Sequence, residues 1–482
     1  MITCDHPGER SGVCRHLLAD SDLEHLEHFT GRRAERVLVC RACAAALPGD
    51  LAQVCATCRD HAAEGGCAGI TGTPEIVDAA SSLRFEHLHI ELGGPALLDI
   101  QPVLGGDRCR WIGLDGDGRL HAIDLDRRTT VVVAGLPPEA IELTAAVVMR
   151  VSPDGRLVAI ANRHGRQGIV LDLDTRLPAL TLLRDDYQHG HSDFPLAFLE
   201  RGGRQLLVHA TAWNRLEVVD ARTGALLTAR EIAPYERDGP RPEHYLDYFH
   251  CGLAISPGQR SIADNGWVWA PVGIVTAWSL ERWLDANPWE SEDGPSRREL
   301  GWRDYYWDGP LCWLDDDRLA IYGYGNDDQW LVPAAQIFDV RTGARTHWFP
   351  GPQGTFVFDR FLFALAHNEL TVWDVERGTR LARAPAAAAV VRYHPTARTF
   401  ITLPGPGVTV MRLRGHHADA AWNTGIVTEL ARTIARDRSF DELPVLGDAL
   451  EAAGCTDGEL LAHCQHPGEH GERCWVLERL LR

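Results

Sequence analysis

The sequence contains no lysine, and all 48 of its basic side chains are arginines. Schiff-base enzymes and P-loop nucleotidases need a lysine amine, which arginine cannot replace because it stays protonated and is not a nucleophile. Both classes are therefore excluded. The 67 acidic residues leave a formal net charge of −19. Binding to a phosphate backbone requires a basic face, so we expect no nucleic-acid partner.

Long apolar runs are missing as well. No stretch of about 18 apolar residues occurs, and the start of the chain lacks a basic segment followed by an apolar one. These absences predict a cytoplasmic protein with no membrane partner. The G-x-S-x-G, H-E-x-x-H and Rossmann glycine motifs are also absent, so no nucleophile or cofactor site is evident. We therefore expect that the protein is not an enzyme.

The 13 cysteines gather at the two ends of the chain. Seven lie in the first 67 residues and three in the last 28. In a chain without a secretory signal, such clusters indicate metal sites rather than disulfides. The distribution divides the sequence into a cysteine-rich head (1–76), a long body (83–414) and a short tail (420–482).

The head carries two kinds of paired metal ligands. They are the C-x-x-C pairs Cys40/Cys43 and Cys55/Cys58, and the C-x-H pairs Cys4/His6 and Cys14/His16. Two C-x-x-C turns can complete a tetrahedral zinc site, and the C-x-H pairs provide enough ligands for a second. We predict one structural zinc ion and consider two, with sequential and cross-braced pairing both open. The alternative interpretation is a reduced thiol cluster that only packs.

A pattern recurs in the body at intervals of roughly 35 to 55 residues. It consists of a short strand, an Asp-rich turn, a second strand, and a third strand that ends in another Asp-containing turn. The turns that follow the third strands can be aligned in three of the repeats, at 219–224, 338–343 and 373–378. In each, an aspartate can bond its own turn backbone and a glycine suits a positive φ. Short strands at this period predict a β-propeller.

The body resembles the WD-repeat family through Trp373-Asp374 and the Ser-Pro-Asp-Gly turn at 152–155. Most repeats lack the family's Gly-His and Trp-Asp pairs, so the resemblance implies a WD-like propeller rather than a true member. We count seven blades, with six as the alternative. The innermost strands are expected near 98–104, 146–152, 194–199, 250–256, 310–315, 354–359 and 389–394. Segment 85–92 is predicted to supply the last blade's missing strand and to close the ring.

Three long or polar connections of neighbouring blades, at 185–193, 233–248 and 302–308, are predicted to share one face. Converging aromatic residues and arginines are typical of a protein-binding hot spot. The candidate partner-binding residues are Tyr235, Tyr245, Tyr248, Trp302, Tyr305, Tyr306 and Trp307. The same loops could instead pack on one another and cap the channel. A further alternative gathers a metal ion among His189, His191, Asp193, His244 and His250.

The tail returns to helical periodicity, and capping boxes at Ser439/Glu442 and Thr456/Glu459 mark helix starts. We predict about four short helices. This stretch resembles a C-terminal module recurrent in planctomycete, myxobacterial and actinobacterial proteins, which implies no activity. The matching residues are Phe440, Leu443, Pro444, Leu446, Asp448, Ala449, Leu450, Gly454, Cys455, Leu461, His463, Cys464, His470, Cys474 and Trp475. For the cysteines and histidines among them we favour packing, with a metal site as the alternative.

The sequence therefore predicts a mainly β protein: a seven-bladed WD-like β-propeller with a small N-terminal zinc-binding domain and a C-terminal bundle of short helices. The predicted function is a non-enzymatic scaffold with structural zinc in the head and a protein partner on the propeller loops. The alternative is a metal-dependent enzyme or ligand sensor that uses the histidine-rich loops.

Overall fold

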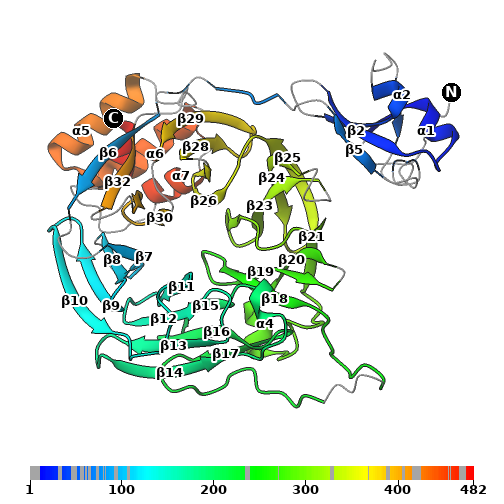
Figure 1. The fold of residues 1–482 in the computed structure, drawn as a ribbon. Helices are drawn as coiled ribbons and strands as arrows, with labels where there is room; N and C mark the ends of the chain where they lie inside the picture. Colours follow the sequence, from blue (N-terminus) through cyan, green and yellow to red (C-terminus); the bar gives the residue numbers. More distant parts are fainter. Residues whose placement is uncertain are drawn as a thin grey trace.

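The computed structural model of the chain shows a small head with a sheet, a ring of further sheets and a helical tail (Figure 1). The prediction of a mainly β protein is confirmed, because strands make up most of the head and body. The structure describes residues 11–30, 35–44, 51–54, 59, 62, 67–71, 75–79, 81, 83–91, 96–105, 109–233, 239–269, 271–325, 331–366, 368–386, 391–403, 408–414, 425–453, 455, 458–465 and 474–481.

Seven antiparallel sheets follow one another along the described part of the body. The first three contain β7 (Leu97–Pro102), β8 (Arg110–Asp115), β9 (Arg119–Asp124) and β10 (Thr129–Gly135); β11 (Val147–Val151), β12 (Leu157–Asn162), β13 (Gln167–Asp172) and β14 (Leu177–Leu183); and β15 (Leu196–Arg201), β16 (Arg204–Ala212) and β17 (Arg215–Asp220).

The remaining four sheets continue the same order. They contain β18 (Phe249–Ile255), β19 (Ser261–Val268), β20 (Val272–Ser279) and β21 (Arg298–Asp304); β22 (Leu311–Trp313), β23 (Arg318–Tyr324), β24 (Val332–Asp339) and β25 (Ala344–Pro350); β26 (Thr355–Asp359), β27 (Phe361–Ala366), β28 (Glu369–Asp374) and β29 (Thr379–Pro385); and β30 (Val391–His394), β31 (Thr399–Thr402), β32 (Val408–Arg414) and β6 (Arg84–Ile90).

The first strands of the seven sheets coincide with the strands that we expected innermost. Strands β7, β11, β15, β18, β22 and β26 contact one another in this order, and β30 contacts β7. Strand β6 pairs antiparallel with β32 over its full length, from Ile90 opposite Val408 to Arg84 opposite Arg414. The segment at 85–92 thus lies where the sequence analysis expected it, and this pairing joins the two ends of the body.

The turns that follow the third strands explain the repeat. Asp220 accepts a hydrogen bond from the Arg222 amide at 3.1 Å, and Gly224 closes the turn with a φ of 73°. A side chain with a Cβ atom rarely adopts this φ, so the glycine is required there. The other two aligned turns repeat this geometry, with Asp339 and Gly343 and with Asp374 and Gly378.

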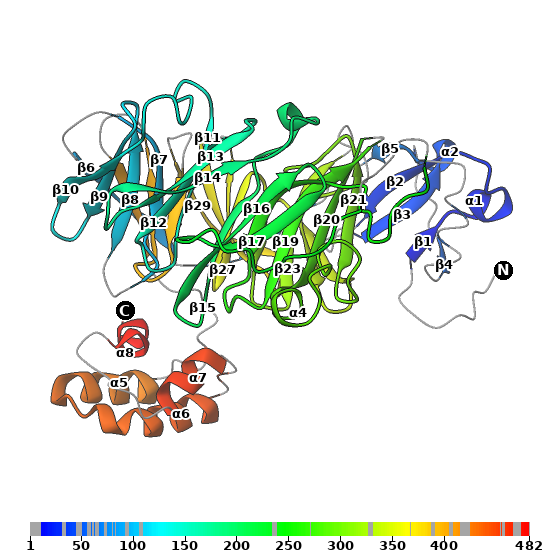
Figure 2. The same cartoon turned by 90° about the horizontal axis from the view of Figure 1, so that it is seen from below.

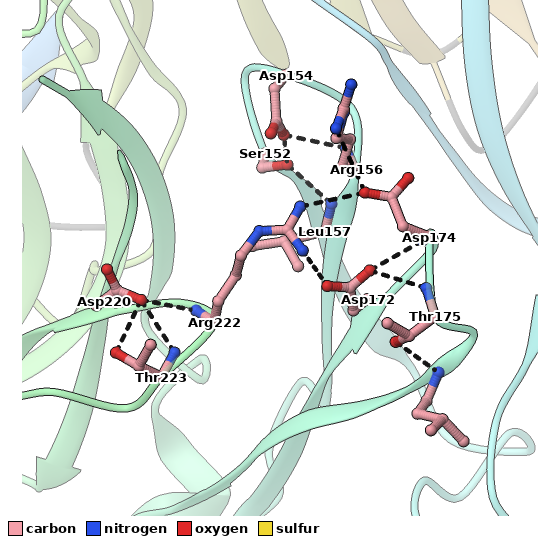
Figure 3. A network of polar contacts seen from close by, with 11 residues as sticks. Ser152, Asp154, Arg156, Leu157, Asp172, Asp174, Thr175, Asp220, Arg222 and Thr223 are labelled. Carbon is pink, nitrogen blue, oxygen red and sulfur yellow. Dashed lines mark hydrogen bonds and ion pairs between the residues drawn. The ribbon is translucent and has the colours of Figure 1, made fainter. Parts of the chain in front are cut away.

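The same turns tie neighbouring sheets together (Figure 3). The Arg222 guanidinium, from the turn after β17, forms ion pairs with Asp172, at the end of β13 of the preceding sheet, and with Asp174 just after it. Asp174 also lies 3.5 Å from Arg156, in the turn before β12. Each turn therefore stabilises its own hairpin and the contact between two sheets.

The third sheet has three strands, and a less regular segment occupies the place of the fourth. The Leu227 amide donates to the Val218 carbonyl at 2.8 Å. Farther along, the buried guanidinium of Arg230 pairs with Glu217 at 2.9 Å and with Glu292 at 2.5 Å. Because such a buried network is costly when incomplete, it fixes this segment against the sheet and against the connection that precedes β21.

The head is a five-stranded sheet with two short helices. Its strands are β1 (Ser11–Val13), β2 (His25–Thr30), β3 (Glu35–Cys40), β4 (Ala52–Val54) and β5 (Cys67–Thr71), in the order β4-β1-β3-β2-β5. Helix α1 (Arg15–Ala19) follows β1, and α2 (Arg41–Ala44) follows β3. The described core is small, with Leu17, Leu38 and Val39 at its centre. Such a core alone provides little stability to a module of this size.

The tail contains four helices: α5 (Gly425–Asp437), α6 (Leu443–Ala452), α7 (Gly458–Gln465) and α8 (Trp475–Leu480). It lies below one part of the ring (Figure 2), and Arg398 of the body stands over the Trp475 ring at 5.6 Å. The first predicted capping box is wrong in detail. Ser439 begins a short 3-10 turn (Phe440–Glu442) without capping a backbone amide, and α6 begins only at Leu443. None of the described helices is long and apolar enough to cross a membrane.

Candidate functional site

Four potential metal ligands converge in the head. One ligand atom each of Cys14, His16, Cys40 and Cys43 lies within 4.8 Å of all the others. The His16 Nδ1 atom is 3.4 Å from the Cys40 sulfur and 3.3 Å from the Cys43 sulfur. Separations of this size are typical of ligands that share one tetrahedral metal ion. Three thiols and one imidazole therefore form a group that can hold a metal ion.

Local structure places the four side chains. Cys14 stands at the start of α1, where its amide donates to Leu38 of β3, and His16 lies in the first turn of that helix. Cys40 ends β3 and Cys43 lies in α2, so the C-x-x-C pair folds as a strand-to-helix turn. The Cys40 amide donates to the Cys14 sulfur at 3.3 Å. Parallel pairing of β1 with β3 thus brings two distant motifs to one point.

The surroundings make the two thiols of the C-x-x-C turn unequal. Burial raises the pKa of Cys40, but hydrogen bonds with the Cys43 backbone and with His16 outweigh it and lower that pKa to about 7. Burial and the hydrogen bond shared with Cys40 raise the pKa of Cys43 to about 12. Since the thiolate is the form that binds metal, the geometry already favours the ligand state at Cys40.

The sequence analysis left the pairing of the head ligands open. Among the described residues, the partner of Cys40/Cys43 is the C-x-H pair Cys14/His16. Four predicted metal ligands lie outside the described residues: Cys4, His6, Cys55 and Cys58. Sequence spacing could not choose between these pairings, because the choice depends on which strands lie side by side.

The tail cysteines pack differently from those of the head. Cys455, Cys464 and Cys474 are buried among the apolar side chains that hold the four helices together. Burial, together with Cys474 and Cys455, raises the pKa of Cys464 to about 12. The Trp475 indole donates to His463 Nδ1 at 3.1 Å, so the proton of a neutral His463 lies on Nε2, 3.3 Å from the Cys474 sulfur. That tautomer is a hydrogen-bond donor and not a metal ligand.

The histidine-rich loops have separate partners. His189 contacts the His164 carbonyl, His244 contacts Asp293, and the buried His250 lies 2.5 Å from the buried Asp264. Asp193 pairs with Arg163 at 2.6 Å. Within the described part of the chain, the group in the head is the only one with metal-ligand geometry.

Six aromatic rings form a continuous cluster of ring contacts, which we call the aromatic face: Tyr187, Trp213, Phe249, Trp267, Trp269 and Trp307. Its centre is the stack of Phe249 on Trp267, with ring centroids 3.9 Å apart and an interplanar angle of 8°. The Trp307 indole donates to the His191 carbonyl at 2.9 Å, which joins the loop at 302–308 to the loop at 185–193. Two of the three connections expected on one face therefore meet.

The aromatic face has a buried base and an exposed upper side. Trp267 and Phe249 are almost fully buried, whereas the side chains of Trp269 and Tyr187 are 59% and 48% exposed. Gly273 allows the segment before Asp308 to cross closely over β20, because a Cβ atom there would come within 1.8 Å of the Tyr306 carbonyl oxygen. Because the buried rings of Phe249 and Trp267 contact the exposed rings of Tyr187 and Trp269, they restrict the positions of the exposed rings.

The predicted partner-binding residues divide into three groups. Trp302 and Tyr305 are highly exposed, and Tyr245, Tyr306 and Trp307 are half-buried. Tyr248 is buried, and its hydroxyl donates to the Ile274 carbonyl at 2.8 Å, so its assignment to a partner surface is wrong. The remaining candidate, Tyr235, lies outside the described residues.

Comparison with known proteins gives distant likenesses only. No family model matches the chain, and no curated protein matches it. Among solved structures, it is similar to a chain of the mitotic checkpoint complex, with 12% identity, a TM-score of 0.44, and coverage of 71% of this chain and 94% of the other. It is also similar to the WD40 repeats of RRP9, with 11% identity, a TM-score of 0.43, and coverage of 70% and 100%. No function follows from these likenesses.

Of the six members of the aromatic face, Trp307 was a candidate residue and Tyr187 lay in a candidate connection, at 185–193. The sequence analysis missed the other four: Trp213, Phe249, Trp267 and Trp269. They lie in or beside strands, where an aromatic residue is normally read as core. One signal was available in the pattern Trp267-Val-Trp269, because alternation in a strand sends both rings to the same side. Only the fold shows that this side meets the neighbouring loops.

Proposed function

We propose that the protein is a non-enzymatic protein-interaction scaffold. In this proposal, the seven body sheets are the blades of a WD-like propeller (83–414) closed by β6. The head (1–76) holds a structural zinc ion, and the tail (420–482) is a helical adaptor. The observation that carries the proposal is the aromatic face, where rigid and partly exposed rings lie together on one surface.

The energetics of the aromatic face favour binding. A tryptophan ring buries roughly 150–250 Å² when covered, so covering the exposed half of Trp269 contributes about 2 kcal/mol. Because Phe249, Trp267 and Trp307 already fix the neighbouring rings, little side-chain entropy is lost on association. Rigid aromatic anchors around a buried centre are the residues that dominate protein interfaces.

The contacts within the body support the propeller. Successive first strands touch from β7 to β26, β30 returns to β7, and β6 pairs with β32. A closed ring of this kind leaves only short, protected strand edges for pairing with other chains. It also holds the connections of the third and fourth sheets, which carry the aromatic face, in one place.

The head fits zinc by its donor set. Sulfur and imidazole nitrogen are preferred zinc ligands, and four of them leave no open position for a substrate. Cys14, His16, Cys40 and Cys43 would hold the ion, and their two motifs would then be joined through it. The metal would stabilise a module whose described apolar core is small. Its role is therefore structural.

The scaffold proposal is tested with cross-linking and mass spectrometry in lysate of the source organism. The double variant Tyr187→Ala, Trp269→Ala removes the two exposed rings of the aromatic face. Its matched control, Val131→Ala with Leu177→Ala, removes two comparably exposed apolar side chains from outer strands. We expect a specific set of cross-linked proteins that the control keeps and the double variant loses. Retention of the full set by the double variant would contradict the proposal.

A further inference from the structure

Exposed negative charge borders the aromatic face on two sides. Asp186 precedes Tyr187 in the chain, and Asp304 pairs in register with Val272, at the turn that carries Trp269. Both carboxylates are exposed, and neither forms an ion pair with any residue that the structure describes. Their charges are thus available at the surface, on the same two segments or strand ends that carry the exposed rings.

The arginines of the same two segments are turned inward. Arg184 is 3% exposed, and its guanidinium donates to backbone carbonyls that include those of Ser192 and Gly165, at 2.9 and 2.8 Å. Arg303 is also 3% exposed and lies over the Tyr306 ring at 5.6 Å. With these two cations buried and Asp186 and Asp304 exposed, the fully exposed charges of these two segments are negative.

We propose that the aromatic face binds a basic segment of a partner protein, with an arginine or lysine side chain over the ring of Trp269 or Tyr187. This inference rests on the proposed function and specifies the chemistry of its partner. A cation over an aromatic ring is attracted by the ring quadrupole, and the apolar stem of a long basic side chain covers ring surface at the same time. Asp186 and Asp304 then stand next to the bound charge. An acidic segment would meet repulsion at the same two carboxylates.

The global charge of the chain supports the same choice of partner. A net charge of −19 attracts cationic partners over distance and raises the rate of encounter at low salt. Attraction of this general kind does not select a site, whereas stacking on Trp269 does. The two contributions can therefore be separated by experiment.

The test uses the full-length protein and two labelled peptides, hexa-arginine and hexa-glutamate, with affinity measured by fluorescence anisotropy at low and high salt. The variant Trp269→Ala should bind hexa-arginine about two- to five-fold more weakly, as expected for a cation on an exposed ring. The variant Asp186→Asn, Asp304→Asn should also weaken binding, by about three-fold at low salt and less at high salt. Hexa-glutamate should not bind.

A charge-matched control separates the site from general attraction. Asp126→Asn with Glu281→Gln removes two exposed acids from outer positions and should leave the affinity for hexa-arginine within error. Equal weakening by this control and by the Asp186/Asp304 pair would overturn the inference. So would unchanged affinity in Trp269→Ala, or binding of a neutral oligosaccharide such as maltohexaose that requires Trp269. Thermal unfolding of each variant verifies the fold.

The two proposals fail in distinguishable ways. If the Tyr187/Trp269 variant loses its protein partners while Trp269→Ala binds hexa-arginine like the wild type, the scaffold proposal stands and the basic-segment inference is wrong. If the variants change neither result, both are wrong. Loss of hexa-arginine binding together with loss of partners supports both.

Discussion

The two ends of the chain contain similar residues in different surroundings. In the head, three cysteines and one histidine converge beside a small core, and the histidine is exposed. In the tail, three cysteines lie inside an apolar core with Leu446, Leu450 and Leu460, and His463 is held by Trp475. The comparison teaches that a cysteine and histidine count does not decide the role, whereas the supply of apolar partners does. We therefore expect the head, and not the described part of the tail, to depend on a metal ion for its stability.

The largest expected effect is loss of the head metal. In Cys43→Ser, we expect zinc to be absent and the head to become sensitive to protease, because structural zinc contributes about 10 kcal/mol or more in small modules. The tail should keep its protection. Metal analysis and limited proteolysis with mass spectrometry measure both results. The control is Cys109→Ala, a buried body cysteine. Full zinc content in Cys43→Ser would contradict the inference that the head, unlike the tail, depends on a bound metal ion.

An intermediate effect concerns the buried tail thiol. Cys464→Ala should leave the zinc content unchanged and destabilise the tail by about 1 to 2 kcal/mol, as expected for a small cavity. In the wild type, iodoacetamide at pH 8 should not modify Cys464, because burial and the neighbouring cysteines raise its pKa to about 12. Above pH 9, an unfolded thiol ionises while the folded one keeps its proton, so tail stability should fall as pH rises. Rapid alkylation, or zinc lost with Cys464, would contradict this.

The smallest expected effect lies at the His463 hydrogen bond. Trp475→Phe removes the indole donor, and we expect the tail to lose about 1 kcal/mol with no change in the head. Nitrogen NMR of labelled histidine should show Nε2–H as the dominant tautomer of neutral His463 in the wild type and a mixture in the variant. Dominance of the Nδ1–H tautomer in the wild type would instead favour a metal on Nε2 and remove the difference between the two ends.

Much of the body could be read from the sequence because its determinants are local. The turns at 219–224 and 373–378 form as expected, since an aspartate and a glycine a few residues apart dictate the backbone without distant help. The position of β6 beside β32 also followed, because the repeat left one strand missing in the last sheet and one strand spare before the first. In a repeat protein, the number of strands in each unit shows which strand is missing, so a pairing between distant segments can be predicted.

The sites could be predicted only in part. Cys40 and Cys43 were recognisable as potential metal ligands. Their proximity to Cys14 and His16, however, depends on the parallel pairing of β1 with β3. Likewise, the loop at 302–308 was a candidate surface, yet Tyr248, expected exposed in a neighbouring loop, is buried under β19 and β20. The exposure of a single aromatic ring depends on packing that spacing does not encode.

The sequence by itself excluded lysine chemistry, and it predicted the repeat of the body and a division of the chain into three parts. These properties follow from residue identity and from turns a few residues long. The tertiary structure alone decided which cysteines meet, that the tail cysteines belong to an apolar core, and that six rings join into one face. Each of those outcomes requires contacts between segments far apart in the chain, and such contacts are selected by the packing energy of the whole fold.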